Sequence, residues 1–235
     1  MRRWLAGLAA AGLLVATGHA ENVPGPSISV VYGTEPGERA LDADSHGGNP
    51  FATALIEALA GPPDAISATL DRVTIKQSDE LQFPDLSDAR DLSRVALENS
   101  ESGAALVVVF ADYGDAQGMP SLPGAAFDAD RVARAFQRAG YKVTVHVASD
   151  AKTYKTAISD FADRAATADA AVVYTTGHGM EVSEGSSIFL IPPDAQRPPF
   201  KLEGFISLTS VSRAVRGADR GFVFYAGCRD NPLKL

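Results

Sequence analysis

The chain reads Gly221-Phe222-Val223-Phe224-Tyr225-Ala226-Gly227-Cys228-Arg229-Asp230-Asn231-Pro232 at the point where its only cysteine follows an apolar run. The apolar residues predict a buried strand, and the polar residues after Gly227 predict a turn. An earlier stretch, Ala170-Ala171-Val172-Val173-Tyr174-Thr175-Thr176-Gly177-His178-Gly179, ends in the same way on a histidine. Reactive groups in α/β sheets gather beyond the carboxyl ends of parallel strands. The two stretches therefore predict a base beside a thiol, which thiol nucleophilic catalysis requires.

Apolar runs of strand length alternate with helical patterns along the rest of the chain. Near-continuous hydrophobicity in the strands predicts a mostly parallel sheet that is covered on both faces. The predicted strands are 28–32, 105–110, 142–147, 171–176 and 222–226. The predicted helices are 51–59, 64–75, 125–136, 153–165 and 207–215, with a short helix in 92–96. Residues 181–191 predict a β-hairpin that turns at Glu184-Gly185.

The first 20 residues have the pattern of a secretory signal. Arg2 and Arg3 precede a short apolar segment, and Gly18-His19-Ala20 has the small residues of a cleavage site. The apolar segment is shorter than the ~20 residues that a membrane span needs. We therefore expect cleavage after Ala20 and a periplasmic or secreted protein with no stable membrane span.

The charge of the remaining chain argues against nucleic acid as a partner. Residues 1–20 hold two of the 21 basic residues and none of the 29 acidic ones, so the rest carries a formal charge of −10. Phosphate binding needs clustered cations, which this chain lacks. An exported chain with a single cysteine cannot form an internal disulfide, so Cys228 is a thiol that pairs with another molecule, a reactive thiol or a buried inert one.

The chain from residue 104 onward resembles the bacterial caspase-like and metacaspase-like peptidases. The similar segments are Ala105-Leu106-Val107-Val108-Val109-Phe110, Leu122-Pro123-Gly124, Asp128-Ala129-Asp130, Tyr174-Thr175-Thr176-Gly177-His178-Gly179, Phe189-Leu190-Ile191-Pro192-Pro193-Asp194-Ala195 and Cys228-Arg229-Asp230-Asn231-Pro232. His178 lies 50 positions before Cys228, which agrees with caspase spacing. The resemblance implies an α/β caspase-like three-layer α/β/α sandwich. Its six-stranded sheet would be mostly parallel, with the last and shortest strand antiparallel.

The halves of that family's chain are exchanged in this sequence. Residues 31–42, Asn49-Pro50-Phe51 and Gln82-Phe83-Pro84-Asp85 resemble the segment that normally follows the cysteine. Residues 21–87 would then be the small-subunit-like half, 88–103 a connector and 104–235 the catalytic half. Circular permutation explains this order, because the termini of compact domains often lie close together. Residues 21–235 would together form one domain, in which 28–32 pairs in parallel with 222–226. The alternative is a fragment that needs a partner half.

The resemblance also implies the roles of the site residues. Cys228 would be the nucleophile and His178 the base, and the backbone N–H groups of Gly179 and Cys228 would form the oxyanion hole. Thr176 is the position from which the family contacts substrate. Neither a cofactor nor a metal is implied, and no zinc-ligand spacing is present.

The substrate is predicted only as a peptide or protein. Metacaspases cleave after Arg or Lys and usually carry an acid two residues before the cysteine, but Ala226 stands there. Asp112 and Asp115, beyond the first strand of the catalytic half, are candidate replacements. The pairs Asp42/Asp44 and Asp128/Asp130 are interpreted as solvated faces rather than calcium ligands.

Two other functions compete with a cysteine endopeptidase. A catalytically weak peptide-binding module would explain the missing acid at Ala226. A serine hydrolase would need a Gly-x-Ser-x-Gly turn, which is absent from the sequence.

Overall fold

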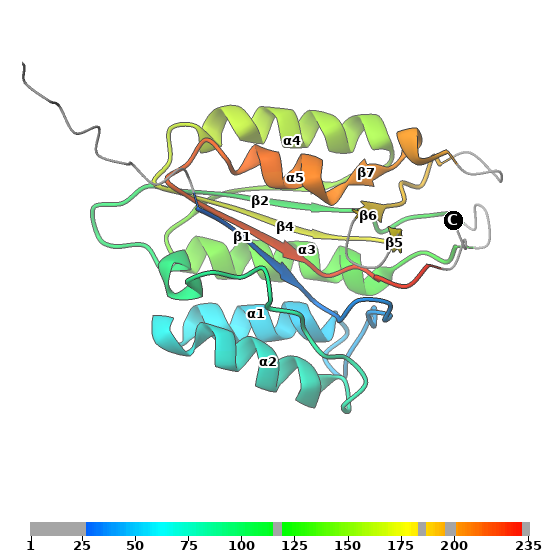
Figure 1. Cartoon of the computed structure of the whole chain (residues 1–235), viewed down its shortest axis with the longest axis horizontal. Coiled ribbons are helices and arrows are strands. Elements are labelled where there is room, and N and C mark those ends of the chain that lie inside the picture. Colours follow the sequence, from blue (N-terminus) through cyan, green and yellow to red (C-terminus); the bar gives the residue numbers. More distant parts are fainter. Residues whose placement is uncertain (1–26, 115–118, 183–186, 196–200, 232–235) are drawn as a thin grey trace, which may run out of the picture.

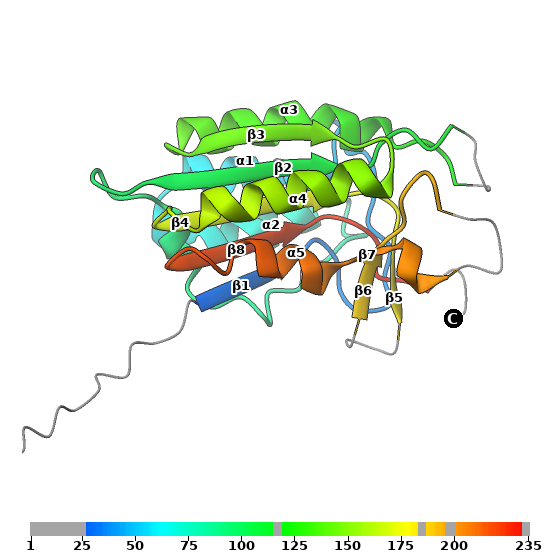
Figure 2. The same cartoon turned by 90° about the horizontal axis from the view of Figure 1, so that it is seen from above.

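The computed structural model describes residues 27–114, 119–182, 187–195 and 201–231. Its centre is a parallel sheet of five strands in the order β1-β8-β4-β2-β3 (Figure 2). The strands are β1 (Ser27–Tyr32), β2 (Gly103–Val109), β3 (Lys142–Val147), β4 (Ala170–Thr176) and β8 (Arg220–Tyr225). All five predicted strands are therefore present, with bounds that differ from the prediction by no more than two residues.

Helices cover both faces of the sheet. They are α1 (Pro50–Ala60), α2 (Ile66–Gln77), α3 (Pro123–Arg138), α4 (Ala151–Ala165) and α5 (Leu208–Ala214). The helices α4 and α5 lie on one face, α1 and α3 lie on the other, and α2 lies outside α1 (Figure 1). Side chains alternate between the two faces along each strand. Val107 packs among the α1 and α3 side chains, whereas Leu106 and Val108 pack among those of α4 and α5. This arrangement is the predicted three-layer α/β/α sandwich.

Polar side chains cap the first turns of three of the predicted helices. The Asn49 side chain accepts a hydrogen bond from the backbone N–H of Phe51, with Pro50 in the first turn of α1. Asp150 caps α4 and Ser207 caps α5 in the same way. Each cap satisfies a backbone N–H that has no partner inside its helix.

The strand order that permutation requires is confirmed. Strand β1 pairs in parallel with β8 along its whole length, from Ser27 opposite Arg220 to Tyr32 opposite Tyr225. Strand β2 lies between β3 and β4, as predicted. Residues at the start of the chain thus complete the sheet beside the cysteine strand.

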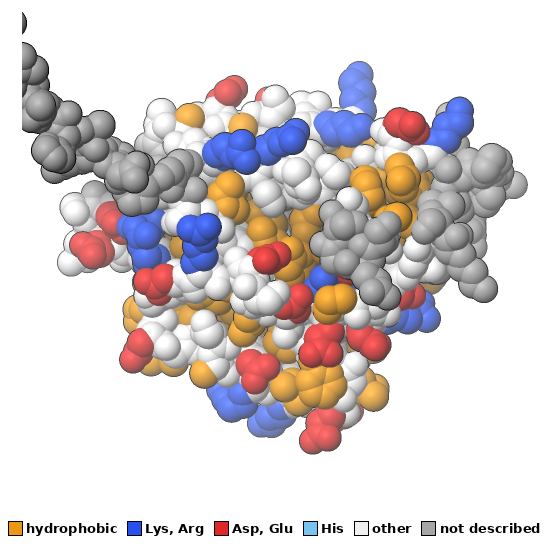
Figure 3. All heavy atoms as spheres, in the orientation of Figure 1, with side chains coloured by type: hydrophobic (Ala, Val, Ile, Leu, Met, Phe, Trp, Pro, Cys, Tyr) orange, Lys and Arg blue, Asp and Glu red, His pale blue; other side chains and the backbone are white. Residues whose placement is uncertain are grey.

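The prediction of six strands is wrong for the described residues, where the central sheet has five. The expected short antiparallel strand is reduced to one bridge, in which Tyr32 and Asp85 exchange two backbone hydrogen bonds. The Asp85 carboxylate accepts the backbone N–H of Ser87. Such local side-chain bonds compete with a sheet ladder. Beyond Ser87, a single backbone bond, from the N–H of Val30 to the carbonyl oxygen of Asp88, joins the segment to β1. The bridge leaves Ile28 and Val30 only partly buried, and apolar side chains gather there between α5 and α2 (Figure 3).

The predicted hairpin forms part of a second, smaller sheet. Strands β5 (Gly179–Val182) and β6 (Ser187–Leu190) are antiparallel, and β7 (Ile206–Ser207) pairs with β6. The turn at Glu184-Gly185 lies outside the described residues. This sheet lies beyond the carboxyl ends of the central strands (Figure 2). The short helix predicted in 92–96 is a single 3₁₀ turn, Leu92–Val95. Among the described helices, none is long and apolar enough to cross a membrane.

Candidate active site

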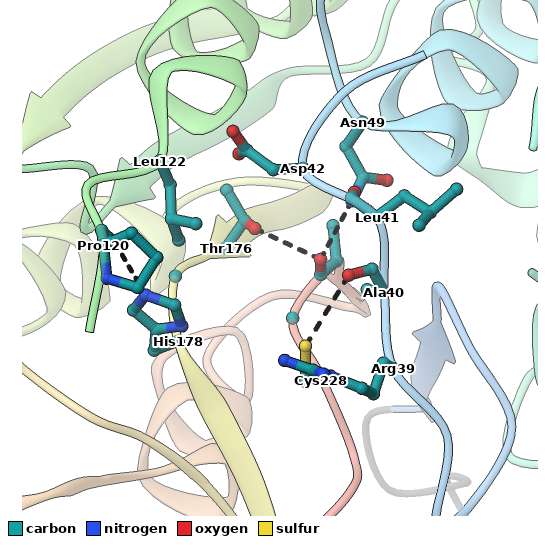
Figure 4. Close-up of a pocket in the computed structure, with 13 residues that line it drawn as sticks. Arg39, Ala40, Leu41, Asp42, Asn49, Pro120, Leu122, Thr176, His178 and Cys228 are labelled. Atoms are coloured by element: carbon teal, nitrogen blue, oxygen red, sulfur yellow. Dashed lines mark hydrogen bonds between the residues drawn. The ribbon is translucent and has the colours of Figure 1, made fainter. Parts of the chain in front are cut away.

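His178 and Cys228 line one pocket of about 200 Å³ at the carboxyl edge of the sheet (Figure 4). His178 follows β4 and Cys228 follows β8, and these two strands are neighbours. The remaining lining comes mainly from two segments, residues 39–42 after β1 and residues 120–122 before α3. The pocket therefore combines residues from both halves of the chain.

The histidine loop is held by Tyr113. The Tyr113 hydroxyl accepts the backbone N–H of His178 at 2.9 Å and donates to the carbonyl oxygen of Ile191 at 2.9 Å. The Tyr113 ring also meets the imidazole edge-on, with 4.5 Å between ring centroids. Both the backbone and the ring of His178 are thus fixed by one buried side chain.

The imidazole has a defined tautomer. Its Nε2 lies 2.8 Å from the carbonyl oxygen of Pro120. Because a carbonyl oxygen can only accept, Nε2 must carry a hydrogen and donate it. In the neutral ring, Nδ1 is then the basic nitrogen. The Pro120 carbonyl therefore orients His178 as a carboxylate orients the histidine of a catalytic triad.

The Cys228 thiol is protonated in this arrangement. Its sulfur donates a hydrogen bond to the carbonyl oxygen of Ala40 at 3.6 Å. Burial raises the pKa of the thiol, and the negative charge of Asp230 adds to this effect, whereas the Arg39 guanidinium opposes it. The thiol proton has to turn from Ala40 before it can pass to His178.

The turn that contains Cys228 packs tightly against Gly179, the first residue of β5. The Tyr225 hydroxyl donates to the carbonyl oxygen of Cys228 at 2.8 Å. A Cβ atom on Gly179 would overlap that hydroxyl and would lie 2.8 Å from the Cys228 carbonyl oxygen. Only glycine allows this close approach of the two backbones. Gly179 and Cys228, the predicted oxyanion-hole residues, are therefore adjacent in space.

Arg229 stabilises the same turn through its side-chain contacts. Its guanidinium is buried and bonds to Glu181 at 2.7 Å and to Asp85 at 2.6 Å. It also lies 4.3 Å from the centre of the Tyr32 ring. Because its partners come from β5, from β1 and from the segment beside β1, Arg229 ties the cysteine turn to three separate parts of the chain.

The described candidate substrate-binding residues, Thr176 and Asp112, differ in whether they line the pocket. Thr176 lines the pocket, where its hydroxyl donates to the Ala226 carbonyl oxygen at 3.2 Å. Asp112 does not line it, and its carboxylate accepts hydrogen bonds from Gly114 and Ser121 within its own loop. Asp115 lies outside the described residues. The structure therefore gives no support to Asp112 as the acid that replaces Ala226.

Sequence reasoning missed the pocket residues that come from the first half of the chain. Arg39, Ala40, Leu41, Asp42 and Asn49 all line the pocket. The Asn49 side chain donates to the carbonyl oxygens of Leu41 and Ala226, which joins this segment to the end of β8. Asp42 is the acid that lines the described pocket, and its carboxylate accepts the N–H groups of Gly124 and Ala125 at the start of α3.

The interpretation of the acidic pairs as solvated faces is wrong for Asp128. This side chain is fully buried, where its carboxylate accepts the backbone N–H of Asn49 and bonds to Arg131. Burial raises the pKa of Asp128 to about 7. Asp42 and Asp44 also bond to protein groups, since Asp44 accepts the Thr53 hydroxyl. Within the described ranges, no group of three or more His, Cys, Asp or Glu side chains could hold a metal ion.

Comparison with known proteins identifies the family. A family model described as the caspase domain matches residues 102–232, which is more than half of the chain. A search of curated proteins found no match. The matched stretch contains β2, α3, the hairpin and both candidate dyad residues. The chain therefore belongs to the peptidase family that is defined by the caspase domain.

Proposed function

We propose that this protein is a cysteine endopeptidase in which Cys228 is the nucleophile and His178 is the general base. The observation that carries the proposal is the shared pocket, in which Pro120 fixes Nε2 of His178 and leaves Nδ1 as the basic nitrogen. A thiol beside an oriented imidazole is the arrangement that thiol peptidases use.

Each step of peptide hydrolysis has a group to perform it. Nδ1 of His178 takes the thiol proton, and the sulfur attacks the carbonyl carbon of the substrate. The carbonyl oxygen gains the displaced electron pair and is stabilised by the N–H groups of Gly179 and Cys228. His178 then gives its proton to the leaving amine as the C–N bond breaks. A water molecule, deprotonated by His178, attacks the thioester, and the sulfur departs as the acid product forms.

The preference for the residue before the cleaved bond depends on Asp42. Ala226 cannot supply a carboxylate, whereas Asp42 lines the described pocket. Two backbone N–H groups already bond to Asp42, so its attraction for a substrate cation is weakened but not removed. A panel of peptides with Arg, Lys, Asp or Leu at that position distinguishes a basic preference from an acidic or neutral one.

A peptide-binding module with little activity is the second candidate. The raised pKa of the Cys228 thiol and its bond to Ala40 favour it, because an unactivated thiol attacks slowly. On this alternative the pocket would bind a peptide, but the peptide bond would remain intact.

One pair of measurements tests the dyad. Cys228 is the only cysteine, so iodoacetamide labels one site. If His178 takes the thiol proton, the labelling rate should rise well below pH 8 although burial raises the pKa of the thiol, and His178→Ala should move that rise upward. The parent should cleave the peptide panel, whereas Cys228→Ala and His178→Ala should lose about a thousandfold or more in kcat. A Cys228→Ala variant that cleaves as fast as the parent contradicts the proposal, and a parent that binds peptides without cleaving them supports the binding module.

We further propose export, with cleavage after Ala20 and a periplasmic or secreted product. The support is the basic, apolar and small-residue pattern of residues 1–20, which lie outside the described residues. Mass spectrometry of the exported protein should find Glu21 at the N-terminus. Intact Met1 on cytoplasmic protein would contradict this.

A further inference from the structure

We propose that Arg39 is a further catalytic residue, whose guanidinium lies beside the Cys228 sulfur and stabilises the thiolate as it forms. This inference rests on the proposed peptidase function. It concerns the segment after β1, which the match to the caspase domain does not include.

The position of Arg39 follows from its neighbours. Arg39 and Cys228 both line the active-site pocket, and the next residue, Ala40, accepts the thiol hydrogen bond. The Arg39 side chain extends from the backbone alongside Cys228 (Figure 4). Its Nε forms an ion pair with Asp230 at 3.5 Å, two residues beyond the cysteine. The guanidinium is thus held between a carboxylate and the reactive sulfur.

The other groups around the sulfur explain why a cation is needed. Asp230, two residues beyond the cysteine, carries a negative charge that raises the pKa of the thiol, and a second carboxylate, Asp42, lines the pocket. The nearby hydroxyls of Tyr113 and Tyr225 are neutral, because burial raises the pKa of both. His178 becomes a cation only when it has taken the thiol proton. Arg39 is therefore the permanent cation among the described lining residues, since a guanidinium does not lose its charge in proteins.

The chemical role is limited to one step. The S–H bond breaks, the proton goes to Nδ1 of His178, and the electron pair stays on sulfur beside the guanidinium. An adjacent opposite charge favours the ionised thiol, and burial and Asp230 both oppose ionisation. When the sulfur attacks the substrate its charge moves to the carbonyl oxygen, so the contribution of Arg39 is made before that step.

The exposure of Arg39 sets the size of the effect. Its side chain is 80% exposed, so solvent weakens its field at the sulfur. We expect Arg39→Gln to raise the midpoint of the Cys228 alkylation profile by roughly 0.5–1 pH unit, at the low end for an adjacent opposite charge. Arg39→Lys keeps the charge and should retain most of the effect. The exposed position means that these variants should fold like the parent.

A matched control removes the same charge elsewhere. Arg72 is an exposed arginine of α2 that is paired with a carboxylate, Glu57 of α1. Arg72→Gln changes the net charge as Arg39→Gln does, and it should leave the alkylation profile in place. Equal profiles for Arg39→Gln and Arg72→Gln would overturn the proposal.

A second background separates direct from indirect action. Asp230→Asn removes the carboxylate that opposes thiol ionisation, so it should lower the midpoint. If Arg39 acts on the sulfur itself, Arg39→Gln raises the midpoint in this background too. If the shift vanishes there, Arg39 only neutralises Asp230, and the direct role is wrong. Alkylation needs no peptide cleavage, so a clear Arg39 shift in a parent that cleaves nothing would refute the peptidase function and leave the effect on the thiol.

Discussion

At the scale of single residues, Tyr113 shows how the fold controls the base. Its hydroxyl sits between the backbone of His178 and that of Ile191, and its ring touches the imidazole. The position was accessible from sequence, because Tyr113 closely follows β2 at the same sheet edge. Its partners were not, because they lie 65 and 78 residues away along the chain.

Tyr113→Phe should therefore slow catalysis more than it harms folding. The variant keeps the ring contact but leaves the N–H of His178 and the carbonyl of Ile191 without their partner. We expect a loss of about 1–2 kcal/mol in the free energy of unfolding. We also expect kcat to fall on the order of ten- to a hundredfold as the imidazole shifts, with KM little changed.

Tyr154→Phe is the matched control. Tyr154 is also fully buried, and its hydroxyl bonds to that of Thr175 at 2.7 Å without touching His178. Urea titration should give the two variants similar losses of stability, while only Tyr113→Phe lowers kcat. Equal rates for both variants would mean that the Tyr113 hydroxyl does not position the base.

At the scale of elements, the periodicity of apolar residues located the strands and helices, but not the irregular segments that pack beside them. The apolar runs that became β2, β4 and β8 are buried on both faces, so their patterns were unambiguous. Residues 39–42, which line the pocket, have no periodic apolar pattern, and the sequence did not identify them as pocket residues. Their position depends on long-range bonds such as that from Asn49 to Ala226.

An ion pair joins the connector, residues 88–103, to the start of β8. Arg220, at the start of β8, donates two hydrogen bonds to the carboxylate of Glu101 at 2.6 and 2.7 Å. The bonds from Arg220 lower the pKa of Glu101 from 4.5 to about 2. The folded state therefore favours the ionised form, and this stabilisation is present above pH 4.5 and is lost as the pH falls towards 2.

Glu101→Gln should remove that pH dependence. We expect the variant to have a lower Tm than the parent at pH 7 and to lose less Tm between pH 5 and pH 2.5. Glu57→Gln, which removes an exposed carboxylate paired with Arg72, should follow the parent. Calorimetry over this range checks the result, and parallel curves for the parent and Glu101→Gln would show that the pair does not stabilise the fold.

At the scale of the whole molecule, we propose that the two halves form one caspase domain in permuted order. The support is the β1–β8 ladder together with a core that draws on both halves. Phe51 of α1 is fully buried with its ring 6.5 Å from that of Phe224 in β8, which in turn lies 6.3 Å from the ring of Phe136 in α3. Without β1, strand β8 would present an unpaired apolar edge, which natural proteins avoid. A half without its partner would therefore lack part of its core.

Phe51→Ala tests whether the halves unfold together. The variant leaves a cavity beneath Phe224 and should lose about 3–5 kcal/mol in the free energy of unfolding. Five of the six tyrosines lie in residues 104–235, so in the chain that starts at Glu21, tyrosine fluorescence reports mainly on the second half. Far-ultraviolet circular dichroism reports on both halves. If they share one core, both signals shift to the same lower urea midpoint. Phe127→Ala, at a ring that is 48% exposed on α3, should shift neither by much. An early transition seen by circular dichroism alone, with the tyrosine midpoint unmoved, would mean that the first half unfolds as a separate unit and that the two halves are not one domain.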